Sequence, residues 1–123
     1  MTNFLDTYDA LEIVEGLGFR VKDLGLLHAA VARPQAHAYG EDAYASLELK
    51  AAAFAHSVAN NDSLLDGNRR TSWVTLNAFL HMNEYTLNMT DVEGEDFILG
   101  LATERFNIEQ AATRIRKKMV RLK

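Results

Sequence analysis

The chain has 123 residues, 48% hydrophobic and 24% charged, a balance typical of one globular domain over residues 1–123. It has no cysteine, which excludes disulfides and cysteine-ligated zinc. No apolar run reaches the length of a membrane span and no secretory leader pattern opens the chain, so we expect a cytoplasmic protein without membrane contact.

The net charge of −4 is unevenly distributed along the chain. Residues 1–66 hold ten acidic and four basic residues, whereas six of the thirteen basic residues lie between Arg114 and Lys123. Such a basic segment binds nucleic acid or an acidic partner in some proteins. Because the whole chain is acidic, we favour a solvated helix end whose cations complement the helix dipole, and we expect no direct nucleic-acid binding.

Helical periodicity runs through most of the sequence and predicts an all-α fold. Two short helices are expected at about 7–16 and 22–32, the first ending at Gly16 and Gly18. Segment 33–40 then interrupts the helical pattern with a proline and a glycine. We expect an exposed loop or a small hairpin-like flap there, with a plain connector as the alternative.

Four longer helices are predicted in the rest of the chain, one of them starting just after Gly67 and another capped by Asp91. Segment 85–89 is a candidate extended piece that links two of them. The apolar stripes are Leu47, Ala51, Phe54, Ala55 and Val58; Trp73, Leu76, Phe79 and Leu80; Phe97, Ile98, Leu101 and Ala102; and Ile108, Ala111, Ala112, Ile115, Met119 and Leu122.

Residues 62–71, Asp-Ser-Leu-Leu-Asp-Gly-Asn-Arg-Arg-Thr, carry the chemistry of the chain. If Gly67 opens a helix, the first backbone N–H groups have no internal partner and form an anion site that a ligand can approach closely. The side chains that would bind phosphate with them are those of Asn68, Arg69 and Arg70. The stretch is no P-loop, because the spaced glycines and the Gly-Lys-Ser/Thr ending are missing.

Asp66, just before these donors, either caps the helix or holds a Mg²⁺ ion that binds phosphate oxygens. The motif would then bind ATP with its metal and stabilise charge in phosphoryl transfer. On composition alone, a capped helix with two surface arginines explains residues 66–71 equally well.

Residues 61–71 resemble the signature of death-on-curing toxins, a branch of the Fic-fold superfamily, which reads approximately His-x-Phe-x-Asp-Ala/Gly-Asn-Lys-Arg. The resemblance covers nearly the whole chain in the same order. Its further matches are Lys22–Leu27, Ala30, Arg33–Gln35, Lys50–Ala53, His56–Ser57, Thr71–Trp73, Phe79–Leu80 and Asn83. A match of this length is far more specific than the signature alone.

The resemblance implies a Fic-fold bundle of about six helices, with a central motif loop that opens a helix N-terminus. It implies a cytosolic toxin of a bacterial toxin–antitoxin pair, partnered by a Phd-like antitoxin. Such toxins are similar to kinases that use ATP and Mg²⁺ to phosphorylate a threonine of translation elongation factor Tu. The segment 33–40 corresponds to the region where the superfamily places a flap that docks the target.

The resemblance also assigns roles by position. Asp66 would hold Mg²⁺ and act with Arg70 in catalysis, and the phosphates would be bound by Gly67, Asn68, Arg69 and Arg70. The wider superfamily mostly transfers AMP, and in that branch a small glycine follows the motif Asn. This chain has Arg69 there, which favours the kinase-like branch, with AMP transfer as an alternative.

Asp62 stands where the family has the histidine that accepts the proton of the attacking hydroxyl. Aspartate is shorter and a weaker base than histidine at neutral pH, so we expect impaired catalysis. The alternatives are a working aspartate base, a second carboxylate on the metal beside Asp66, or a catalytically dead module that still binds an antitoxin. His56 is either a displaced base or a packed, hydrogen-bonded residue, and we favour the second.

Overall fold

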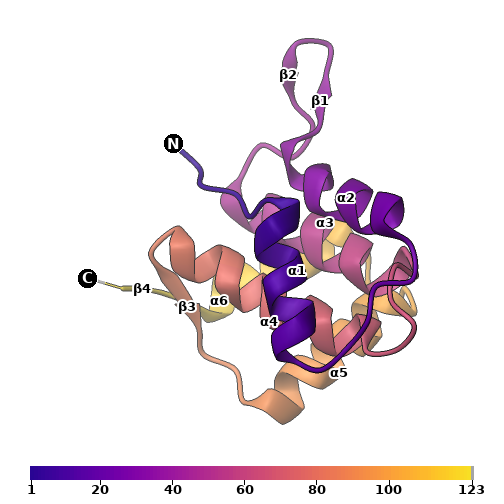
Figure 1. The fold of residues 1–123 in the computed structure, drawn as a ribbon. Coiled ribbons are helices and arrows are strands. Elements are labelled where there is room, and N and C mark those ends of the chain that lie inside the picture. Colours follow the sequence, from indigo (N-terminus) through magenta and orange to yellow (C-terminus); the bar gives the residue numbers. More distant parts are fainter. Residues whose placement is uncertain (123) are drawn as a thin grey trace.

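The computed structural model describes residues 1–122, so Lys123, the end of the predicted basic segment, lies outside the described residues. The predicted all-α fold is confirmed (Figure 1). Its helices are α1 (Thr7–Gly16), α2 (Leu24–Ala32), α3 (Leu47–Asn60), α4 (Asn68–Met82), α5 (Asp91–Ala102) and α6 (Ile108–Lys118). The shorter elements are the 3-10 turn η1 (Arg33–Gln35) and the strands β1 (His37–Ala38), β2 (Glu41–Asp42), β3 (Tyr85–Leu87) and β4 (Met119–Arg121).

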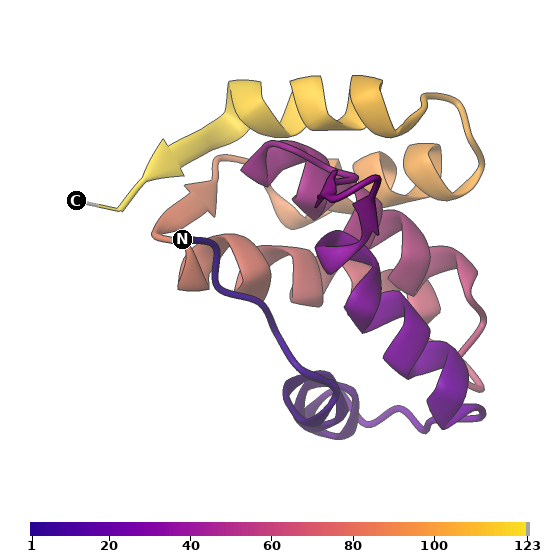
Figure 2. The same ribbon diagram turned by 90° about the horizontal axis from the view of Figure 1, so that it is seen from above.

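Helix α3 lies at the centre of the bundle and packs against α2, α4, α5 and α6. Its alanines 51–53 and 55 are fully buried, and their small side chains let α4 approach closely. At this contact the Ser72 hydroxyl donates a 2.6 Å hydrogen bond to the Ala55 carbonyl. Phe54 of α3 meets Phe79 of α4 edge to face, with ring centroids 5.7 Å apart. Figure 2 shows α6 and α1 on opposite sides of this centre.

The start of α5 corrects one prediction. Asp91 is the first residue of the helix and not its cap, because the Thr90 side chain accepts the hydrogen bond from the Glu93 N–H at 3.1 Å. Glu93 reaches back to the Thr90 N–H and completes a capping box. This hydrogen bond from the Thr90 backbone lowers the pKa of Glu93. Asp91 instead accepts from the indole Nε1 of Trp73 at 3.3 Å, which ties α5 to α4.

The C-terminal helix is shorter than its apolar stripe predicts. It ends at Lys118, and residues 119–121 form β4, which pairs antiparallel with β3 in the register Tyr85 to Arg121 and Leu87 to Met119. Segment 85–89 is therefore extended, as predicted, but its first half pairs with β4 and does not merely link two helices. Met119 still packs against the core, so the apolar pattern continues after the backbone leaves the helix.

Segment 33–40 forms η1 and the first strand of a β-hairpin, which confirms the hairpin-like interpretation. The turn places Tyr39 and Gly40 in the left-handed region, at φ 54° and 80°. Figure 1 shows the hairpin projecting from the bundle. It precedes α3, whereas the motif loop follows α3, and a 14-residue helix spans about 21 Å. The hairpin and the motif loop therefore lie at opposite ends of α3.

The contact between α4 and α5 generates a stability prediction. A Cβ atom at Gly94 would overlap the buried indole ring of Trp73, so Gly94→Ala should lower the free energy of unfolding by about 1–3 kcal/mol. At Gly16, the last residue of α1, an added Cβ meets nothing within 4 Å. Urea unfolding should leave Gly16→Ala at wild-type stability or above. Equal stability of the two variants would contradict the close contact.

Candidate functional site

The motif loop between α3 and α4 is fastened to the segment 20–23 by backbone hydrogen bonds. The Lys22 N–H donates to the Ser63 carbonyl at 2.8 Å, and the Leu65 N–H donates to the Arg20 carbonyl at 3.0 Å. Leu64 lies between these bonds with 1% of its surface exposed. The buried Leu64 side chain therefore anchors the loop against the rest of the fold.

Asn68, the first residue of α4, closes the loop from the other side. Its Oδ1 accepts from the Leu64 N–H and its Nδ2 donates to the Leu64 carbonyl, both at 3.2 Å. One amide thus satisfies both polar backbone groups of a buried residue. The side chain predicted to bind phosphate holds the loop in shape, and its phosphate-binding role stays a prediction.

Gly67 is the N-cap residue of α4 and has the left-handed dihedrals φ 80° and ψ 17°. A Cβ there would overlap the ring of Phe19, so both the turn and its packing require glycine. No side chain among the described residues caps α4. The N–H groups of its first turn are consequently free to bind an anion.

Asp66 does not cap α4 through its first turn. Its Oδ1 accepts from the Gly67 N–H at 2.8 Å, which leaves the exposed Oδ2 for another ligand. Among residues 1–122, no group of three or more acidic or histidine side chains could together hold a metal. Asp66 is therefore the single carboxylate of the motif that would hold a Mg²⁺ ion, which proteins commonly bind through one or two carboxylates.

A cavity of about 310 Å³ opens beside the first turn of α4. Arg69 and Arg70 line it from α4, and Glu95, Ile98 and Leu99 line it from α5. The Arg70 Nη1 lies 3.4 Å from the Glu95 Oε1, and both side chains are about half exposed or more. An anion in this cavity therefore competes with Glu95 for Arg70. The structure brings both arginines, as predicted, to one helix terminus.

Asp62 lies in the same loop, with a left-handed φ of 55° and a side chain that is 70% exposed. Its Oδ2 accepts from the Lys22 ammonium group at 2.6 Å. The partner comes from a residue 40 positions away, and the sequence offered no local signal for it. Lys22 is thus a site residue that only the fold identifies, and it engages one oxygen of the carboxylate at the family's base position.

His56 lies on α3 and lines a different cavity from the one beside Arg69 and Arg70. Its side chain is 21% exposed, and its Nδ1 accepts from the Arg33 Nη1 at 2.8 Å. Burial, followed by the charge of Arg33, lowers the pKa of His56. The geometry agrees with the packed, hydrogen-bonded alternative.

The fold and the site define a helical protein in which an acidic loop leads into a helix N-terminus without a side-chain cap, beside a cavity lined by two arginines. The model of the Fic/DOC family matches residues 4–80, which include the whole motif loop. The chain is also 44% identical over 120 residues to the protein named Toxin Doc from Mycolicibacterium smegmatis, a match that covers 94% of this chain and 92% of that protein. The chain belongs to the Fic/DOC family. Within residues 1–122, no helix combines the length and the apolarity that crossing a membrane requires.

The lowered pKa of His56 predicts a pH dependence of stability. The unfolded chain protonates this histidine below about pH 6.5, whereas the folded chain keeps it neutral to lower pH, so its contribution is lost as the pH falls. The urea midpoint should drop less between about pH 7.5 and about pH 5 for His56→Gln than for the wild type. The exposed His81→Gln should keep the wild-type slope. An unchanged slope in His56→Gln would contradict the assignment.

Proposed function

We propose that the chain is the toxin of a bacterial toxin–antitoxin system, built as a kinase that transfers phosphate from ATP to a threonine of elongation factor Tu. The likeness to Toxin Doc supports the toxin. The observation that carries the phosphoryl chemistry is the uncapped first turn of α4 beside a cavity lined by Arg69 and Arg70. Such an array binds and stabilises the negative charge of a transferring phosphoryl group.

Each motif residue has a role in this proposal. The N–H groups that follow Gly67 and the two arginines bind the phosphates of ATP, and Glu95 leaves Arg70 when they do. Asp66 would hold Mg²⁺ through the oxygen that Gly67 does not use. When bound, this ion neutralises charge on the phosphate oxygens. Asn68 keeps the loop in the conformation that aims these groups at one ligand.

Arg69 supports phosphate transfer over AMP transfer by this fold. Its exposed side chain lines the cavity at the position where the AMP-transferring branch has a glycine. A guanidinium there occupies space and adds a positive charge beside the helix N-terminus. The two chemistries add groups of different mass to the target, so mass spectrometry of the modified protein separates them.

Asp62 makes the transfer slow. Its carboxylate must accept the proton of the attacking threonine hydroxyl, but Lys22 already holds one of its oxygens. An aspartate is also a weaker base than the histidine of the family at neutral pH. The anion site itself depends on other residues and remains in place.

A second candidate function follows because the phosphate-binding residues are separate from the residue at the base position. The chain would be a catalytically dead member of its family that still binds a Phd-like antitoxin. The observation in its favour is the Lys22–Asp62 ion pair at the base position, beside an otherwise complete motif. Nanomolar binding of the antitoxin by calorimetry without phosphate transfer would support this function over the first.

Restoring the base tests the kinase proposal. With ATP, Mg²⁺ and purified elongation factor Tu, Asp62→His should transfer phosphate about 10²–10⁴ times faster than the wild-type chain, the usual contribution of a general base. Incorporation of labelled γ-phosphate measures the rate. The double variant Asp62→His, Arg70→Ala keeps the base and loses a phosphate-binding arginine, so it should transfer almost no phosphate. A silent Asp62→His chain would refute the kinase proposal.

The ion pair at Arg70 generates a binding prediction that requires no turnover. Glu95→Gln removes the carboxylate that competes with phosphate, and exposed pairs of this kind contribute little energy, so the affinity for Mg²⁺–ATP should rise about two- to fivefold. Calorimetry measures this affinity in chains that keep the wild-type Asp62.

The matched control is Glu12→Gln on α1, which removes the same charge beside Met82, at the other end of α4. It should bind Mg²⁺–ATP as the wild type does. Equal gains in Glu95→Gln and Glu12→Gln would assign the effect to net charge and not to the Arg70 pair.

A further inference from the structure

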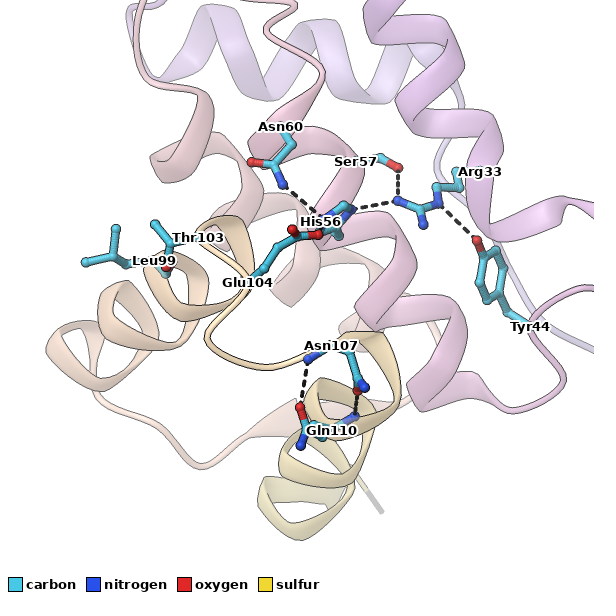
Figure 3. Close-up of polar contacts among 10 residues, drawn as sticks. All are labelled: Arg33, Tyr44, His56, Ser57, Asn60, Leu99, Thr103, Glu104, Asn107 and Gln110. Carbon is cyan, nitrogen blue, oxygen red and sulfur yellow. Dashed lines mark hydrogen bonds and ion pairs between the residues drawn. The ribbon is translucent and has the colours of Figure 1, made fainter.

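A second polar cavity, of about 370 Å³, lies between η1, α3 and the start of α6. Its lining residues with ionisable side chains are Arg33, Tyr44, His56, Glu104 and Glu109. None of them lines the cavity beside Arg69 and Arg70, and none belongs to the motif loop. Figure 3 shows Arg33 between Tyr44 and the α3 residues His56 and Ser57. The proposed phosphate chemistry therefore leaves this cluster unexplained.

Arg33 is held there by neutral groups alone. Its Nε donates to the Tyr44 hydroxyl at 3.0 Å, and its Nη1 donates to the His56 Nδ1 at 2.8 Å and to the Ser57 Oγ at 2.9 Å. These bonds use three of the five N–H groups of the guanidinium. The two on Nη2 have no hydrogen-bond partner, and no carboxylate lies within ion-pair distance of Arg33, in the described part of the chain.

The bonds from Arg33 also determine what its neighbours can offer a ligand. Arginine only donates, so it occupies an acceptor site on the Tyr44 oxygen and leaves the phenolic hydrogen free to donate. It occupies the His56 Nδ1 as well, which assigns the proton of the neutral ring to Nε2. The Asn60 amide group, 3.0 Å from Nε2, then accepts this proton through its oxygen. The cavity thus presents hydrogen-bond donors around a cation without a counter-ion.

We propose that this cavity is a binding site for a carboxylate group, whose two oxygens accept from the Arg33 Nη2 and the Tyr44 hydroxyl. The position of Glu104 supports a carboxylate as the ligand. Its Oε1 lies 3.9 Å from the His56 Nε2, so the chain already brings one of its own carboxylates to the edge of the cluster. The Glu104 side chain is 79% exposed, and it yields to an incoming group at little cost.

The acidic residues at the cavity select for the charge of the ligand. Glu104 and Glu109 add two negative charges near the single positive charge of Arg33, which disfavours a phosphate dianion more than a carboxylate. In the described cluster, the Arg33 Nη2 and the Tyr44 hydroxyl are the donors that remain for the ligand. The carboxylate belongs either to a small organic acid or to an acidic group of a peptide.

The test is a titration of the full-length ¹⁵N-labelled chain with sodium acetate, against sodium chloride at equal ionic strength and neutral pH, without ATP. Acetate should shift the Arg33 Nε–H and His56 ring signals saturably, with a millimolar Kd. Tyr44→Phe removes one donor and should weaken binding about three- to tenfold. Glu104→Gln removes the competing carboxylate and should tighten it about two- to fivefold.

Glu41→Gln on the exposed hairpin is the matched charge control and should bind acetate as the wild type does. Two peptides identify the source of the carboxylate. One has both ends blocked and contains a single glutamate, and the other has a blocked N-terminus and a free C-terminal carboxylate as its only acidic group. Tighter binding of either peptide than of acetate supports a peptide ligand, and equal binding supports a small acid.

Absence of saturable shifts with acetate and both peptides would overturn the proposal. Wild-type affinity in both Tyr44→Phe and Glu104→Gln would do so as well. The proposed kinase function is unaffected by either result, because phosphate transfer uses none of these residues.

Discussion

The pairing of the Asn68 amide with both backbone groups of Leu64 is the contact on which the motif loop depends. A buried peptide group without a partner is costly, and here a single side chain at the start of α4 satisfies two of them. The left-handed Gly67 lets the chain turn directly from that loop into the helix. The first turn of α4 follows Asp66, carries the two arginines and has no side-chain cap. Exposed N–H groups at such a helix start suit the phosphate site that we propose.

Two charged side chains near this turn, Asp62 and Arg70, already have partners within the chain. Lys22 engages Asp62, and Glu95 engages Arg70, through exposed pairs that stabilise the fold only weakly. Such pairs can be displaced at small cost, and Lys22 occupies one oxygen of the carboxylate that stands at the family's base position. Arg33 differs from Arg70, since its hydrogen-bond partners in the described chain are neutral side chains. The two cavities thus present two distinct kinds of cationic site.

Helices with a strong local signal were predictable. The first helix ends at Gly16, and the stripe from Leu47 to Val58 lies within α3. Predictions were wrong where two local signals competed or where a distant segment decided. Threonine and aspartate are both good caps, and the reciprocal bond of Glu93 selects Thr90 over Asp91. The apolar stripe continues through Met119, but pairing with β3 turns that segment into a strand.

For the site, the sequence by itself determined that a helix starts just after Gly67 with two arginines in its first turn, because a helix start depends on local backbone geometry. It also determined that position 62 carries a carboxylate. Only the tertiary structure decided which charges meet: Lys22 reaches Asp62 across 40 residues, and Arg33 reaches Tyr44 and His56 from a separate turn. Local patterns specify dihedral angles and caps, whereas ion pairs and cavities depend on how helices far apart in sequence pack together.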